Sequence, residues 1–176
     1  MEIVNPTKKF KQRSEVIEAV KLLKTEKQIN LAEMMLVGSA AAIAVNIDTV
    51  ANDLDFAVQK DYFAKMKAEF PESLVVVDYT QDGIAGYQSR KIEVIRFKIN
   101  DYLFEFWENY LVNPFTKRVE EGLCVATLAT QIQHHLVMGL PKNKEMLGSL
   151  IERMKTVEYG YYSSRDVRGI WLPQPF

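Results

Sequence analysis

The chain has 176 residues, of which 48% are hydrophobic, enough for a folded core and too many for a disordered chain. Lysine and arginine number 22 against 23 acidic residues, so the net charge of -1 lacks the basic excess of a dedicated nucleic-acid binder. Its single cysteine, Cys124, excludes a disulfide framework and a cysteine-based zinc site within one chain. No apolar stretch approaches the roughly 18 residues of a membrane span, and MEIVNPTKKF lacks an apolar signal core. We therefore expect a cytoplasmic protein with no membrane partner.

The first third of the chain predicts a helix followed by a strand–helix–strand unit. Ser14 is expected to cap a helix that ends near Lys27, because apolar residues recur there at helical spacing. A short apolar run over residues 33–37 predicts a strand, residues 40–45 a helix, and residues 54–58 a second strand.

The middle of the chain predicts another helix and a strand-rich segment. Asp61 is expected to cap a helix that Pro71 ends, and residues 74–77 read as a buried strand before a turn at residues 82–83.

Two alternating runs, residues 90–99 and 102–107, are joined by Asn100 and Asp101, which predicts a two-residue hairpin. That turn determines the register and gives the hairpin a core face and a mixed, polar face. The expected pairs are Ile99 with Tyr102, Phe97 with Phe104 and Ile95 with Phe106 on the core face, and Arg96 with Glu105 and Lys98 with Leu103 on the other.

After Pro114 the pattern turns helical. One helix is expected from Leu128 to Gly139 and a second over residues 146–154, ending near Gly160. The tail, residues 165–176, looks irregular and docks on its own domain or on a protein partner.

Residues 35–58 carry the candidate chemistry. A strand that ends at Gly38 and Ser39 and leads into a helix forms a natural anion site. Strand side chains alternate, so Asp53 and Asp55 project from one face while Leu54 enters the core. Two carboxylates held together repel each other unless a cation lies between them, and Mg²⁺ prefers such oxygen ligands.

This segment resembles the nucleotidyltransferase superfamily of the polymerase-beta-like kind, whose members have a Gly-Ser or Gly-Gly turn followed by Asp-x-Asp on a strand. The string Asp53-Leu54-Asp55-Phe56 is similar to that of the minimal, toxin-associated type. The resemblance implies an α/β (α+β) palm with a mixed sheet, helices on one face and a short C-terminal helical appendage. We expect a palm domain over residues 1–122 and a helical segment with a tail over residues 123–176.

The family uses a third carboxylate on a neighbouring strand, and Glu105 on the polar face of the hairpin is our choice. The structural alternative is a cross-strand ion pair between Arg96 and Glu105, worth about 0.2–1 kcal/mol. Glu93 and Asp78 are the reserve candidates.

The resemblance implies a metal-dependent enzyme that moves a nucleoside monophosphate from an NTP, such as ATP, to a hydroxyl of RNA, a protein or a small molecule. Asp53, Asp55 and Glu105 would be catalytic and would bind Mg²⁺ or Mn²⁺, and Glu105 would help to activate the acceptor hydroxyl. Gly38 and Ser39 would hold the triphosphate. The chain lacks the arginine that the family often has near residues 45–48. A catalytically inactive binding or assembly module, related to phage or toxin–antitoxin systems, is the alternative.

Two further residue types invite a functional interpretation. His134 and His135 are adjacent on a helix and point about 100° apart, so we expect one to pack and one to be exposed rather than to chelate one ion. Cys124 has no evident base partner and is expected to be a small core residue.

Overall fold

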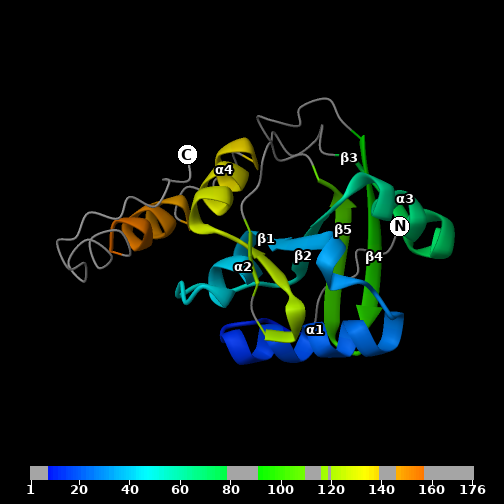
Figure 1. Ribbon diagram of the computed structural model, residues 1–176, viewed down its shortest axis with the longest axis horizontal. Coiled ribbons are helices and arrows are strands. Elements are labelled where there is room, and N and C mark those ends of the chain that lie inside the picture. The colour runs from blue at the N-terminus through cyan, green and yellow to red at the C-terminus, as the bar shows by residue number, and fades with distance from the viewer. Residues whose placement is uncertain (1–7, 79–90, 110–115, 119, 139–145, 157–176) are drawn as a thin grey trace, which may run out of the picture.

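The computed structural model describes residues 8–78, 91–109, 116–118, 120–138 and 146–156. In these residues the strands form one mixed sheet of seven strands, in the order β3-β4-β5-β2-β1-β7-β6 (Figure 1). β2 pairs in parallel with β5, and β1 in parallel with β7, while the other neighbours are antiparallel. The strands are β1 (Met34–Val37), β2 (Leu54–Val58), β3 (Leu74–Asp78), β4 (Lys91–Ile99), β5 (Tyr102–Glu108), β6 (Thr116–Arg118) and β7 (Cys124–Ala126).

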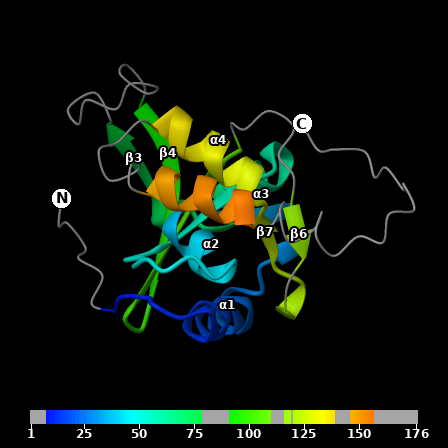
Figure 2. The same cartoon turned by 90° about the vertical axis from the view of Figure 1, so that its left-hand side faces the viewer.

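Helices cover one face of the sheet (Figure 1). They are α1 (Arg13–Lys27), α2 (Gly38–Ala44), α3 (Lys60–Glu69) and α4 (Leu128–Met138), with 3-10 turns η1 (Leu31–Glu33), η2 (Pro71–Ser73) and η4 (Glu120–Gly122). Residues 146–156 are also helical and lie beside α4 in both views (Figures 1 and 2). None of the helices in the described ranges combines the length and the apolar character that crossing a membrane requires.

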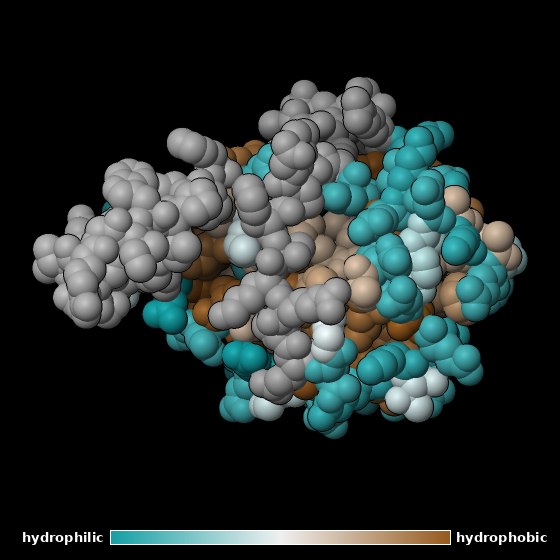
Figure 3. All heavy atoms as spheres, in the orientation of Figure 1, coloured by the Kyte–Doolittle hydropathy of each residue, from teal (hydrophilic) through white to brown (hydrophobic). Residues whose placement is uncertain are grey.

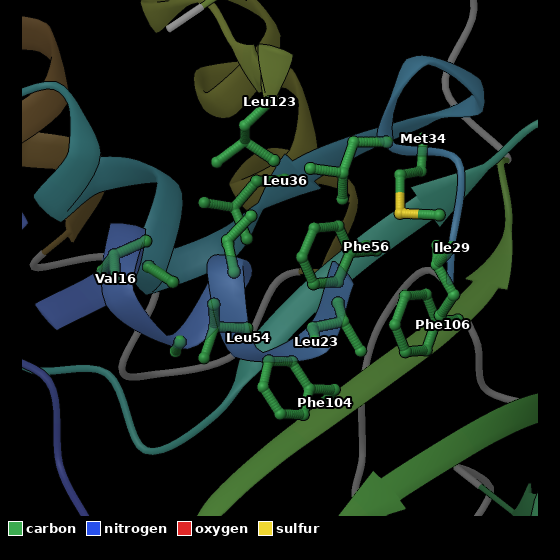
Figure 4. Packing of buried hydrophobic residues seen from close by; sticks show 14 of the residues in the cluster. Val16, Leu23, Ile29, Met34, Leu36, Leu54, Phe56, Phe104, Phe106 and Leu123 are labelled. Carbon is green, nitrogen blue, oxygen red and sulfur yellow. The ribbon is translucent and has the colours of Figure 1, made fainter. Parts of the chain in front are cut away.

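The main core lies between α1 and the covered face of the sheet. Leu23 of α1 packs in the same cluster as Leu54, Phe56 and Phe104, and Leu23, Leu54 and Phe104 are labelled close together in Figure 4. Phe56 and Phe106 stack across the parallel pair β2–β5 with ring centroids 4.9 Å apart. The opposite surfaces of α1 and α3 are hydrophilic, which the lower and right-hand parts of Figure 3 show. Every second residue of β2, namely Leu54, Phe56 and Val58, belongs to this main core.

The other face of the sheet holds a second, smaller apolar cluster. Met35, Val37, Ala57 and Trp107 belong to it, and the indole of Trp107 is 6% exposed. The mixed face expected for the hairpin is present, because Val94 and Trp107 share it with Arg96, Lys98 and Glu105.

The hairpin and its register are confirmed. All five predicted pairs of β4 with β5 are present, and Asn100 at the turn has a φ of +54°. The boundaries predicted for α1 at Lys27 and for β2 are also confirmed. The fold class is the one expected: a mixed sheet with helices on one face and a helical C-terminal part.

The predicted helix caps are wrong. The N-cap of α1 is Gln12 rather than Ser14, because the Glu15 carboxylate accepts hydrogen bonds from the backbone N–H groups that precede the helix. The N-cap of α3 is Gln59 rather than Asp61. The backbone N–H of Gln59 donates to the carbonyl of Glu33, and this bond keeps Gln59 in line with the sheet.

The segment after Pro114 is not simply helical, because β6 and β7 precede α4. β7 pairs with β1, and Val125 is fully buried in the main core. The division into domains 1–122 and 123–176 stays a prediction. The turn at residues 82–83, the helix end at Gly139 and the tail over residues 165–176 lie outside the described residues.

Candidate functional site

Three carboxylates meet where β2 begins. Asp53 directly precedes β2, Asp55 lies within it, and Glu105 is the partner of Asp55 on the parallel strand β5. Each of the three offers an oxygen atom, and these atoms all lie within 4.8 Å of one another. Among the described residues, these three form the one group of acidic, histidine or cysteine side chains that lie close enough together to hold a metal ion. The sequence predicted these three residues as one site, and the structure brings them together.

The Gly38 turn lies directly against this group. Val37 at the end of β1 is the register partner of Asp55, so the chain leaves β1 beside that carboxylate. Gly38 has a φ of +67°, and a Cβ atom built on it would lie 2.8 Å from Oδ2 of Asp55. Only glycine fits this position without displacing the carboxylate or straining the backbone. Ser39 follows in the first turn of α2 and is partly exposed.

Arg96 borders the group on the third strand. Its Nε donates a hydrogen bond of 2.7 Å to Oε1 of Glu105, and its Nη2 contacts the same oxygen. The Arg96 side chain is 25% exposed and that of Glu105 is 12% exposed. The cross-strand ion pair predicted as the structural alternative is therefore present, within the same cluster as the two aspartates. Glu105 therefore belongs both to this ion pair and to the acidic group.

The residues present fit a divalent metal ion. Three carboxylates supply hard oxygen ligands of the kind that Mg²⁺ and Mn²⁺ bind, and a positive charge among them relieves their mutual repulsion. Asp53 and Asp55 are partly exposed, which leaves one side of the group open to water and substrate.

The reserve candidates do not join this group. Glu93 lies on the helix-covered side of β4 and forms a 2.7 Å ion pair with Nζ of Lys67 in α3. Asp78 ends the edge strand β3, and β4 and β5 separate that strand from β2.

Both histidines are buried, so the prediction that one would be exposed is wrong. His134 and His135 are 3% and 4% exposed, with ring centroids 5.1 Å apart. They lie on the face of α4 that packs toward α2 and β7, which also buries Gln131. Cys124 is buried, as expected of a core residue.

The sequence did not indicate a small hollow of about 200 Å³ where β1 begins and β2 ends, at the far end of these strands from the acidic group. No motif marks it, because its walls come from residues with no common spacing. Its lining residues are Ala32, Glu33, Met34, Met35, Ala57, Gln59, Asn109 and Cys124.

No protein-family model matches this sequence, and no curated protein is significantly similar to it. The solved structure of a "putative nucleotidyltransferase" from Thermotoga maritima has a TM-score of 0.53 to this one. The two share 15% sequence identity, over 81% of this chain and 96% of that chain. A second structure with the same description, from H. pylori, has a TM-score of 0.35 and 18% identity, over 70% of this chain and 56% of that one.

At 15% identity the similarity to the Thermotoga maritima protein concerns the fold. The chain has a nucleotidyltransferase-like fold, and the resemblance inferred from residues 35–58 is confirmed at that level.

Proposed function

We propose that this protein is a metal-dependent nucleotidyltransferase that moves a nucleoside monophosphate from an NTP to a hydroxyl of RNA, a protein or a small molecule. The observation that carries the proposal is the close approach of the Gly38 turn to Asp55, one of the three grouped carboxylates. A Cβ atom built on Gly38 would lie 2.8 Å from Oδ2 of Asp55, although the turn and this carboxylate come from different strands.

Asp53, Asp55 and Glu105 would hold Mg²⁺ or Mn²⁺. Bound there, the metal ion supplies positive charge that draws phosphate oxygens to the carboxylates and stabilises the leaving pyrophosphate. The turn at Gly38 and Ser39 holds the triphosphate beside the carboxylates, and the hydroxyl of Ser39 donates a hydrogen bond to a phosphate oxygen.

In the reaction, the acceptor oxygen forms a bond to the α-phosphorus. The bond from that phosphorus to the oxygen that bridges to the β-phosphate breaks, and pyrophosphate leaves with the electron pair. Glu105 takes up the proton of the acceptor hydroxyl and passes it to water. Asp53 and Asp55 would position the acceptor and the triphosphate so that the attacking and leaving oxygens lie in line.

The test is thermal unfolding of the protein with each of the four NTPs, with and without Mg²⁺. A ligand at a hundred times its dissociation constant adds about 2.7 kcal/mol to the free energy of unfolding. We expect a Mg²⁺-dependent rise in melting temperature with at least one NTP, and its loss in the double variant Asp53→Asn, Asp55→Asn. The matched control is Asp48→Asn, which removes one carboxylate from an exposed position outside the group.

A rise that persists in the double variant, or no rise with any NTP, would show that the proposed site is wrong. The inactive binding or assembly module would then be the better account. When the rise is present, the NTP that produces it names the donor, and incorporation of its radiolabelled α-phosphate into RNA, protein or small molecules identifies the acceptor.

A further inference from the structure

One side chain of the site has a role that the metal ligands do not explain. Arg96 on β4 is the register partner of Glu105 on β5, which in turn is the register partner of Asp55 on β2. The three residues form a row across neighbouring strands on the face that carries the acidic group. A guanidinium therefore stands at the border of a cluster that would bind a cation.

The contact between Arg96 and Glu105 involves one oxygen. Nε donates to Oε1 at 2.7 Å, and Nη2 contacts that same atom. An ion pair that neutralises Glu105 lowers the negative charge available to a metal ion. A metal ion and Arg96 therefore compete for the charge of this carboxylate.

The chemistry of the guanidinium suits a second partner. Its planar array of N–H donors matches phosphate oxygens and keeps its charge at every physiological pH. A quarter of the Arg96 side chain is exposed, so it can meet a ligand that approaches the cluster from solvent.

We propose that Arg96 is the counter-ion of Glu105 while no metal ion is bound, and that it turns to the phosphate groups of the nucleotide once a metal ion takes its place. This inference rests on the proposed function and adds a residue that recognises the triphosphate.

The proposal predicts opposite effects of one substitution on two ligands. A positive charge beside the cluster repels a metal ion that binds alone, but it attracts the triphosphate that binds with the metal ion. A residue that only holds Glu105 in position would change both affinities in the same direction.

The experiment measures Mn²⁺ binding by electron paramagnetic resonance, and then binding of inorganic tripolyphosphate by calorimetry at saturating Mg²⁺. In Arg96→Gln we expect Mn²⁺ to bind about tenfold more tightly. The affinity for tripolyphosphate should fall about 10- to 100-fold, as expected for a lost charged hydrogen bond. Arg96→Lys should restore the Mn²⁺ affinity of the wild type but only part of the tripolyphosphate affinity, because an ammonium group lacks the planar fork.

The matched control is Lys98→Gln, which removes a positive charge from an exposed position on the same face of β4. It should change both affinities less than Arg96→Gln does. Weaker Mn²⁺ binding by Arg96→Gln, or unchanged tripolyphosphate binding, would overturn the inference. If Arg96→Gln does not fold by circular dichroism, the tripolyphosphate affinity of Arg96→Lys decides, and a value equal to that of the wild type counts against the inference.

The failure of this inference differs from the failure of the proposed function. A wild-type protein that binds neither Mn²⁺ nor tripolyphosphate contradicts the transferase site itself. A wild-type protein that binds both, with Arg96 variants that behave like Lys98→Gln, contradicts only the role of Arg96.

Discussion

At the scale of single residues, Gly38 links the backbone to the chemistry. Its positive φ favours glycine, and its missing side chain makes room for Asp55. The positive φ and the close Asp55 carboxylate both act at this position, and either alone would favour glycine there. Their coincidence means that a change at Gly38 affects the stability of the fold and the metal site together.

We predict that Gly38→Ala weakens Mn²⁺ binding, because the new Cβ displaces the Asp55 carboxylate. Gly122→Ala separates the two constraints, since Gly122 has a φ of +74° and a Cβ there would meet nothing within 4 Å. Each variant should lose about 1–2 kcal/mol in urea unfolding from the left-handed backbone. Only Gly38→Ala should lose Mn²⁺ affinity. Full Mn²⁺ binding by Gly38→Ala would contradict the close approach of this turn to Asp55.

At the scale of secondary-structure elements, the start of α1 is held by a carboxylate from inside the helix. The backbone N–H groups of Lys11 and Gln12 donate to Oε2 of Glu15 at 2.8 and 2.9 Å. These bonds hold the pKa of the Glu15 carboxyl below its usual 4.5. The folded state thus favours the ionised carboxylate, and this stabilisation is complete above that pH and disappears as the pH falls through the lowered pKa.

The corresponding prediction compares Glu15→Gln with the wild type in urea unfolding, from about pH 7 to about pH 3. The wild type should be more stable near neutral pH, by on the order of 1 kcal/mol. The difference should shrink below the usual pKa of the carboxyl. Glu18→Gln, at an exposed position of the same helix, is the control and should show a smaller change. A difference between wild type and Glu15→Gln that does not vary with pH would contradict the capping role.

The strands could be predicted where apolar and polar residues alternate over many positions and the turn between two strands is short. The alternation over β4 and β5, with two residues between them, leaves one register that puts every phenylalanine of the hairpin in the core. β6 and β7 have only three residues each, too few for alternation to appear, and their place depends on pairing with β1. The cap of α1 was missed because Gln12 is an unusual N-cap residue.

The candidate site was predictable in part for the same reason. Strand alternation puts Asp53 and Asp55 on one face, and the hairpin register puts Glu105 on the polar face of the hairpin. The choice of Glu105 as the third carboxylate came from the family resemblance, and its place beside Asp55 depends on the pairing of β2 with β5. The contact between Gly38 and Asp55 likewise depends on the pairing of β1 with β2. The burial of both histidines depends on how α4 packs, and no local pattern encodes that.

At the scale of the whole molecule, the main core joins segments from both ends of the described chain. Leu123, just before β7, is fully buried in the same cluster as Leu23 of α1. We predict that Leu123→Ala lowers the free energy of unfolding by about 2–5 kcal/mol. Leu136→Ala removes the same atoms from a side chain of α4 that is 62% exposed, and it should change stability by less than about 0.5 kcal/mol.

Urea unfolding of both variants checks this prediction, and equal losses of stability would show that β7 is not part of the main core.

The shared core also allows a test of the division into domains 1–122 and 123–176. Residues 1–122 expressed alone would lack β7 and Leu123, and we expect them to be unstable because Leu36 on β1 loses its partner Val125 on β7.

The parallel pairing of β2 with β5 also determines at which step of folding the acidic group assembles. Asp55 and Glu105 are far apart in sequence, and the hairpin β4–β5 can form before β2 reaches it. Long-range parallel pairing is a slow step, because loop closure must precede the contacts that reward it. Here that step also brings like charges together. A divalent cation present during refolding would ease this encounter, so the metal ion proposed for the finished site would also help the chain to finish folding.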